Sequence, residues 1–281
     1  ENWLKKYAER RYGSCSDNMF EAMKLLNDTV YNPKLNEHGE GAPESGINAR
    51  PSLDVGSPST WGNNLVSYDK KTFEKAASLF LGEANNCKES EGYLFDAVDL
   101  LKQVLSNTAQ EYQKNMSKAY KEKDLIAFMK WSDKFLNLGL FTDEVLCANR
   151  EFMLGNWIKK AEKLASPFDD FTKKIFVFNA RAQITTWGGS RQIAEDGALR
   201  DYSNKQWSGL TKDFYVDRWN SWIKVMKQKL SGQKASEPDW FKNDIRWVWK
   251  ENEYSDTPTK IDLIKTAEKV FASFGVDSAE Y

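Results

Sequence analysis

Apolar residues recur every three or four positions along most of this chain, which is the spacing of one face of an α-helix. In the stretch SDNMFEAMKLLNDTVY, the predicted apolar face is formed by Phe20, Met23, Leu26 and Val30. Ser16 or Asn18 can cap the free amide groups at the start of this helix. The same spacing predicts further helices over residues 67–82, 92–124, 124–149, 150–166, 167–187, 203–230, 238–255 and 257–275.

No segment of any length alternates apolar and polar residues with the period of two that a half-buried β-strand requires. The predicted fold class is therefore all-α, a multi-helix bundle with long irregular loops. The longest helix is expected over residues 92–124, and Gly82 is expected to end the helix before it. The last helix is expected to have Thr257 or Thr259 as its cap and to end at Gly275.

Two connecting segments are longer than the roughly 2–8 residues that usually join packed helices. Residues 32–66 are rich in Gly, Pro, Ser and Asn, but they also contain the run RPSL and Trp61, which favours a loop laid over a surface. The second segment, TTWGGSRQIAEDGALRDYSNKQW, places Gly188-Gly189 directly after Trp187. Because glycine permits a sharp backbone turn, this tryptophan is expected to project from the end of a helix.

The balance of charges excludes several classes of function. The 281 residues carry 40 Lys and Arg against 41 Asp and Glu, a formal net charge of −1, whereas a nucleic-acid binder gathers a basic excess on one face. No apolar run approaches the roughly 20 residues that span a bilayer. We therefore expect neither nucleic acid nor a membrane as a partner.

No metal or other cofactor is expected either. Cys15, Cys87 and Cys147 are widely spaced, and His38 is the single histidine, so that a zinc site of Cys/His type has too few ligands. His38 lies in a polar, glycine-rich loop, where a catalytic triad is not expected. The glycine-rich motifs that bind nucleotide phosphates do not occur.

Paired carboxylates give no catalytic assignment. They occur at Asp169–Asp170, Glu195–Asp196 and Asp96–Asp99, but neighbours on a helix reach the separations of a glycosidase pair by chance. Most acidic residues in a chain this charged are solvated surface groups. No catalytic residue is therefore assigned within this chain.

Aromatic residues are abundant, and one of them stands apart. Large rings usually fill the gaps between long helices, and this role is expected for Trp157, Trp219, Trp222, Trp247 and Trp249. Trp187 differs because it precedes two glycines in a loop. A projecting aromatic face suits the apolar face of a sugar ring, whose hydroxyl groups then need hydrogen-bonding partners.

Three motifs around this loop resemble glycoside hydrolase family 89, the α-N-acetylglucosaminidases. NARAQITTWG, LRDYSNKQWSGL and FYVDRW follow in the order of the family's runs N-x-R-x-Q-x-T-x-W-G, L-D-Y-A-x-K-x-x-x-G-L and Y-x-x-R-W. AERRYG, YN, RPSL and FMLGNW also fall in the expected order. The chain therefore resembles the all-α C-terminal part of that family over nearly its whole length.

The resemblance implies a three-part enzyme with a small α/β domain, a (β/α)8 barrel and an all-α domain packed against the barrel. Residues 1–281 would be the last part alone, a single α-helical C-terminal domain of a larger glycosidase, with the barrel absent from this chain. The family removes terminal α-linked N-acetylglucosamine from glycans with retention of configuration, and its catalytic carboxylates lie on the barrel. This chain by itself is therefore expected to be inactive.

Compared position by position, the resemblance places Trp187 and Tyr202 on the wall of the sugar pocket, with Leu199 beside them. Between the two rings, residues 190–200 include an insertion relative to the family's usual spacing, and the resemblance assigns that insertion no role. Three further matches lie either behind this wall or at purely structural positions: Arg181, Asp201 and Asn204.

The partners implied are a glycan that ends in α-linked N-acetylglucosamine and the barrel of the same polypeptide. The resemblance also implies secretion in a bacterium, or a lysosomal location in an animal. Two alternatives remain open. The chain could be a non-catalytic all-α interaction module, with both long loops as partner contacts, or a carbohydrate-binding module without an attached enzyme.

Overall fold

The structure, a computed structural model, describes residues 2–32, 45–55, 59, 66–87 and 89–274, so His38, Trp61 and Gly275 lie outside the described residues. The predicted all-α class is confirmed, because the described residues contain no strand and only one isolated β-bridge, between Met153 and Ser208. The α-helices are α1 (Asn2–Tyr12), α2 (Asp17–Thr29), α3 (Lys70–Leu81), α4 (Ala84–Cys87), α5 (Glu91–Lys121), α6 (Leu125–Leu146), α7 (Leu154–Ala165), α8 (Asp170–Gln183), α9 (Asp217–Leu230), α10 (Trp240–Val248) and α11 (Leu263–Phe274). Short 3-10 turns cover Gly46–Asn48 (η1) and Arg150–Phe152 (η2), and π-helical turns cover Gln192–Asp196 (η3) and Thr211–Val216 (η4).

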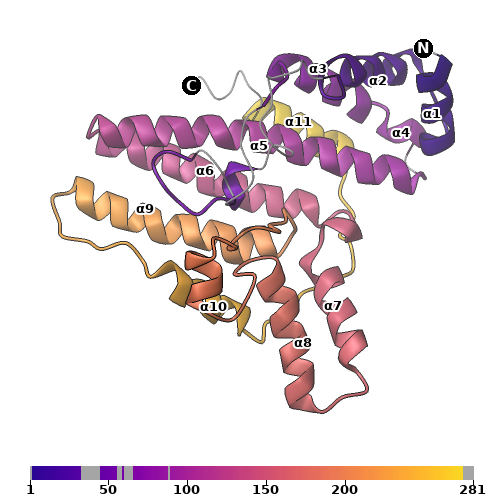
Figure 1. Cartoon of the computed structure of the whole chain (residues 1–281). Coiled ribbons are helices and arrows are strands. Elements are labelled where there is room, and N and C mark those ends of the chain that lie inside the picture. The colour runs from indigo at the N-terminus through magenta and orange to yellow at the C-terminus, as the bar shows by residue number, and fades with distance from the viewer. Residues whose placement is uncertain (1, 33–44, 56–58, 60–65, 88, 275–281) are drawn as a thin grey trace.

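A long hairpin of α5 and α6 forms the centre of the molecule (Figure 1). Ser90 caps α5 by accepting a hydrogen bond from the amide of Tyr93, and Asp124 caps α6 in the same way through Ala127. Between the two helices, Lys123 takes the left-handed conformation that reverses the chain. Helices α1 to α3 and α11 lie on one side of this hairpin, and α9 lies along the other.

The helix predicted over residues 203–230 begins later than expected. Residues 203–209 are not helical, because Ser208 pairs with the segment before α7: its amide donates to the carbonyl of Phe152 and its carbonyl accepts from the amide of Leu154. Gly209 then turns the chain with a φ of +86°. The helix begins with η4 and continues into α9.

The boundaries of the last two helices also differ from the prediction. α10 ends at Val248, and α11 is capped by Asp262, whose carboxylate accepts a hydrogen bond from the amide of Lys265, rather than by Thr257 or Thr259. The backbone of residues 249–262 runs over the start of α7 instead, where Gly155 leaves room for it. A Cβ at Gly155 would lie 2.1 Å from the carbonyl oxygen of Ser255.

The tryptophans predicted to fill gaps between helices do so with one exception, Trp249. Trp219, Trp222 and Trp247 are buried, and Trp157 is half-buried. Trp249 is 52 % exposed and packs against Phe178 of α8, with ring centroids 4.3 Å apart, so it covers the surface rather than filling the core.

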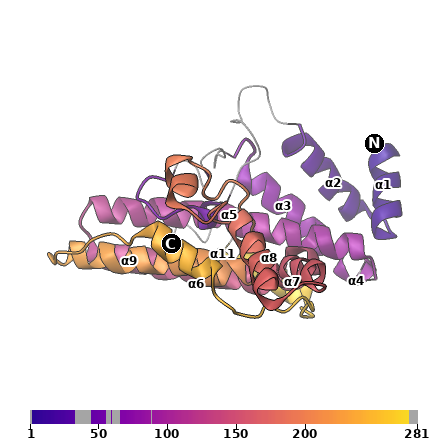
Figure 2. The ribbon, with the colours of Figure 1, turned by 60° about the horizontal axis from the view of Figure 1, so that its bottom comes forward.

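Helices α7 and α8 form a second hairpin that projects from the bundle (Figures 1 and 2). Asp169 caps α8 by accepting hydrogen bonds from the amides of Phe171 and Thr172. The other end of α8 leads directly into the loop of residues 184–209. Across the described part of the chain, no helix combines the length and apolar character needed to cross a membrane.

Candidate functional site

The loop after α8 begins with strained backbone at Trp187. Its amide donates a hydrogen bond to the carbonyl of Ala182, and its φ is +63°. This left-handed conformation costs a residue other than glycine about 1–2 kcal/mol. The backbone bends at Gly188 and Gly189 as expected, and Trp187 itself adds a left-handed residue to this turn. Strain of this kind persists where surrounding contacts impose it, and it concentrates at functional sites.

The two glycines also allow other parts of the protein to pack closely against the loop. A Cβ at Gly188 would lie 3.1 Å from a methyl carbon of Ile193, and one at Gly189 would lie 3.3 Å from the ring of Phe178. The loop therefore folds back on its own π-helical turn η3 and against α8. Trp187 is held between these contacts and the end of α8.

The side chains of Trp187 and Tyr202 meet edge to face at the surface. Their ring centroids are 5.2 Å apart and their planes make an angle of 80°. Trp187 is 36 % exposed and Tyr202 48 % exposed. The half-buried Leu199 lies next to them in the same turn, and its carbonyl accepts a hydrogen bond from the amide of Tyr202. The three residues singled out in the sequence therefore lie in the same loop, with both rings accessible.

Asp201 anchors the residue next to it, Tyr202, from below. It is buried, with a φ of +57°. Its amide donates to the carbonyl of Thr185 at 2.6 Å, which joins the two ends of the loop beneath the rings. Its carboxylate accepts hydrogen bonds from Arg218 of α9 at 3.0 and 3.1 Å. Trp187, which carries one of the two rings, and Asp201, which precedes the other, therefore both have positive φ values.

The other two sequence matches have different surroundings. Asn204 accepts a hydrogen bond from the side chain of Asn48 at 2.7 Å and donates one to the carbonyl of Asp201 at 3.1 Å, so it lies directly behind the wall. Arg181 is buried on the other side of α8, where it donates to the backbone carbonyls of Trp247, Lys250 and Asn252. Arg181 therefore ties α8 to the end of α10.

Three charged residues that received no role in the sequence complete the support of this loop. Arg218 donates to Asp244 of α10 at 2.9 and 2.6 Å, as well as to Asp201. Arg50 donates to Asp244 at 3.2 Å and to both carboxylate oxygens of Glu195 at 2.8 and 2.9 Å. Arg50 and Arg218 stand in the RPSL and FYVDRW runs, so the only signal in the sequence was their place in a motif.

Glu195 titrates in a field set by these arginines. Its partial burial opposes ionisation, but the hydrogen bonds and charge of Arg50, together with the charges of Arg200 and Arg191, outweigh this effect and lower its pKa. The carboxylate therefore stays ionised and paired at neutral pH. A charged residue of the insertion is in this way part of the support of the loop.

Asp143 of α6 holds the far end of the loop. Its buried carboxylate accepts hydrogen bonds from the hydroxyl of Ser208 at 3.1 Å and from the amides of Gly209 and Lys212 at 2.7 and 3.0 Å. Burial raises its pKa, and these three hydrogen bonds offset part of that increase. The loop is thus fixed at both ends to the helical core.

The carboxylate pairs noted in the sequence have other partners. Asp169 caps α8, and Glu195 pairs with Arg50. Asp96 accepts hydrogen bonds from the guanidinium of Arg11 and from the hydroxyl of Tyr12. Among the described residues, no group of three or more His, Cys, Asp or Glu is placed to hold a metal ion.

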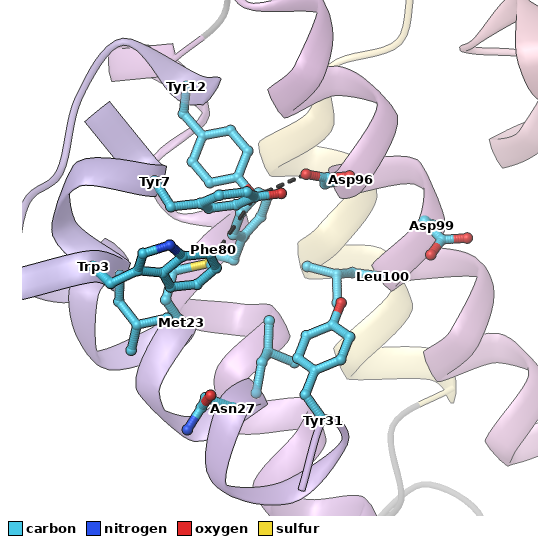
Figure 3. A pocket seen from close by; sticks show the side chains of 12 residues that line it. Trp3, Tyr7, Tyr12, Met23, Asn27, Tyr31, Phe80, Asp96, Asp99 and Leu100 are labelled. Carbon is cyan, nitrogen blue, oxygen red and sulfur yellow. Dashed lines mark hydrogen bonds between the residues drawn. The ribbon is translucent and has the colours of Figure 1, made fainter. Parts of the chain in front are cut away.

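A separate cavity of about 360 Å³ is lined by residues of α1, α2, α3 and α5 (Figure 3). Trp3, Tyr7 and Tyr31 stand around it, and Tyr12 and Asp96 line its wall. The carboxylate of Asp96 is already engaged within the protein, and the other lining residues are mostly aromatic or aliphatic. None of the residues singled out in the sequence as sugar contacts lines it.

Comparison with known proteins gives a consistent result. The family described as the alpha-N-acetylglucosaminidase (NAGLU) C-terminal domain matches residues 3–273. Human alpha-N-acetylglucosaminidase is 26 % identical over 278 residues, which are 97 % of this chain and 35 % of the human protein. This chain therefore spans about a third of the length of that relative.

Solved structures of a family 89 glycoside hydrolase from Clostridium perfringens are similar over the whole fold. The complex with PUGNAc has a TM-score of 0.95 and 42 % identity, covering 100 % of this chain and 32 % of the clostridial chain. The complex with GlcNAc-alpha-1,4-galactose, described as that enzyme's substrate, has a TM-score of 0.94 and 42 % identity, covering 99 % and 32 %. Because this family matches nearly the whole chain, residues 3–273, the protein belongs to the family of alpha-N-acetylglucosaminidase C-terminal domains.

Proposed function

We propose that this chain is the helical domain of a larger, retaining α-N-acetylglucosaminidase and that Trp187, Tyr202 and Leu199 form part of its sugar-pocket wall. The observation that carries the proposal is the edge-to-face pair of exposed rings at Trp187 and Tyr202. Trp187 itself has left-handed backbone, and Tyr202 directly follows the left-handed Asp201; the surrounding contacts impose both conformations.

The chemistry of the pair suits a sugar. The exposed face of Trp187 offers a flat apolar surface for the C–H face of a pyranose or for the methyl of an acetamido group. Tyr202 places a hydroxyl beside that surface, and this hydroxyl can give or accept one hydrogen bond with a sugar hydroxyl or a carboxylate. A ligand held in this way would be oriented by contacts that need no charge on the protein.

The reacting carboxylates would lie in the part of the protein outside this chain. The chain spans about a third of the length of its relatives, and the clostridial hydrolase is described in complex with PUGNAc and with its substrate, GlcNAc-alpha-1,4-galactose. These complexes support a glycan ending in α-linked N-acetylglucosamine as the substrate class. In this proposal the remaining domains supply the nucleophile and the acid/base, and this domain supplies binding.

The test is the activity of the full-length protein on an aryl α-N-acetylglucosaminide, with and without Trp187→Ala. We expect the substitution to lower kcat/KM about a hundredfold, equivalent to ~2.7 kcal/mol of transition-state stabilisation. Trp3→Ala is the matched control, since Trp3 is an exposed tryptophan of α1 and lies outside the loop that carries the proposed wall. An unchanged rate in Trp187→Ala would exclude the wall, and no hydrolysis by the unaltered protein would favour a carbohydrate-binding or interaction module.

A further inference from the structure

The segment of residues 45–53 is a fixed strap between the core and the candidate wall. Ile47 and Ala49 are buried, and the carbonyl of Ile47 accepts a hydrogen bond from the indole of Trp219 at 3.0 Å. The side chain of Gln113 on α5 donates to the carbonyls of Ser52 and Leu53 at 3.2 and 2.9 Å. Because both ends of this strap are tied to the helical core, residues between them project from a rigid base.

The strap contacts the candidate wall at two points. The side chain of Asn48 donates to Asn204, which follows Tyr202 closely. The guanidinium of Arg50 binds both oxygens of Glu195 in η3, at 2.8 and 2.9 Å. A two-pronged contact of this kind fixes orientation as well as distance, because the planar guanidinium matches the geometry of the carboxylate.

The contact at Glu195 is mechanically connected to Trp187. Glu195 belongs to the same π-helical turn as Ile193, whose side chain packs on Gly188, the residue after Trp187. Movement of this turn would therefore remove the packing that keeps Trp187 in its left-handed conformation.

The same arginine is also linked to the far side of the wall. Arg50 donates to Asp244, Asp244 accepts from Arg218, and Arg218 holds the carboxylate of Asp201, which precedes Tyr202. The charges thus alternate from Glu195 to Asp201, and both ends of the series lie in the loop that carries the two rings.

We propose that Arg50 is a positioning residue for the sugar-pocket wall, acting on Trp187 through Glu195; this inference rests on the function proposed above. Arg50 and Glu195 are 16 % and 22 % exposed, whereas Arg218, Asp201 and Asp244 are almost fully buried. Removing the outer pair therefore loosens η3 while the buried part continues to hold the fold. The RPSL run then has a defined role, to fix the loop that binds the sugar.

The experiment uses the full-length protein with Arg50→Gln, Glu195→Gln and the double substitution, assayed on the aryl α-N-acetylglucosaminide. We expect each single substitution to raise KM about tenfold with kcat little changed, since misplacing a contact group by about 1 Å can cost up to about a hundredfold. The double variant should show about the same tenfold effect as either single variant, because both substitutions break the Arg50–Glu195 contact and Asp244 keeps its pair with Arg218. A merely structural role would lower the active fraction, and with it kcat, without raising KM.

Arg191→Gln is the matched control. Arg191 lies on the same insertion, but its hydrogen-bonding partner is the exposed Asp239, which it contacts through a single nitrogen at 2.7 and 2.8 Å, rather than Glu195. A KM in Arg50→Gln that equals that of Arg191→Gln would overturn the inference, as would additive effects in the double variant. If Arg50→Gln does not fold, Glu195→Gln alone decides by the same criterion.

Failure of this inference is distinguishable from failure of the proposed function. If Trp187→Ala has the activity of the unaltered protein, the wall itself is excluded and Arg50 has nothing to position. If Trp187→Ala loses activity while Arg50→Gln and Glu195→Gln keep the original KM, the wall stands and only the role of Arg50 is wrong.

Discussion

The carboxylate of Asp201 lies on the guanidinium of Arg218, with its two oxygens 3.0 and 3.1 Å from the same nitrogen. The other side of this guanidinium holds Asp244 by two hydrogen bonds. All three groups are almost fully buried. One arginine of α9 therefore pairs with a carboxylate of the loop and with a carboxylate of α10, and it joins the candidate site to the core.

Substitution of this arginine should destabilise the domain more than substitution of either of its partners. Arg218→Met leaves two buried carboxylates, of which Asp244 keeps only Arg50, and we expect a loss of about 3–5 kcal/mol in the free energy of unfolding. Asp201→Asn should cost less, because Asp244 still balances the arginine. Denaturant unfolding followed by tryptophan fluorescence measures both. Arg191→Met, at an exposed pair, should leave the free energy of unfolding nearly unchanged.

Replacing Trp187 with glycine should leave the domain more stable than replacing it with alanine. Both substitutions remove the ring, but only glycine adopts a φ of +63° without steric cost, so we expect Trp187→Gly to be more stable than Trp187→Ala by about 1 kcal/mol. Their loss of activity should be equal, since the proposed contact is made by the ring. Melting temperatures and kcat/KM of the two variants separate these effects. A more stable alanine variant would mean that this residue is not left-handed in solution.

Gly155→Ala should destabilise the domain by several kcal/mol. The added methyl would lie 2.1 Å from the backbone oxygen of Ser255, and backbone at that position cannot move aside cheaply. The comparison is Gly82→Ala, where the nearest atom would be 3.4 Å away and the backbone is already helical. A thermal melt of both variants tests this, and equal melting temperatures would contradict the packing of residues 249–262 over α7.

Acid should weaken the Arg50–Glu195 contact. The pKa of Glu195 is lowered in the folded protein, so the contact stabilises the fold above the ordinary glutamate pKa of 4.5, and this contribution disappears as the pH falls through the lowered value. Melting temperatures of the original protein and Glu195→Gln should therefore differ at neutral pH and converge in acid. A difference that grows on acidification would contradict this sign.

The sequence was sufficient for the local features of the fold. The 3.6-residue spacing of apolar positions predicted the long helix that the structure places at Glu91–Lys121, and Ser16 caps α2 as expected. These features depend on residues a few positions apart, so they are legible in a short window of sequence. The grouping of Trp187 and Tyr202 in one loop was also visible, because the chain itself joins them.

Contacts between distant parts of the chain decided what the sequence alone could not. Residues 203–209 were predicted as the start of a helix, but Ser208 pairs with Phe152 and Leu154, and the strained φ of Trp187 follows from packing of the loop on itself. The pairing of Arg50 with Glu195 spans 145 positions. Ionic and steric contacts of this kind act through space and leave no periodic pattern along the chain, so only the tertiary structure defines which charges support the candidate site.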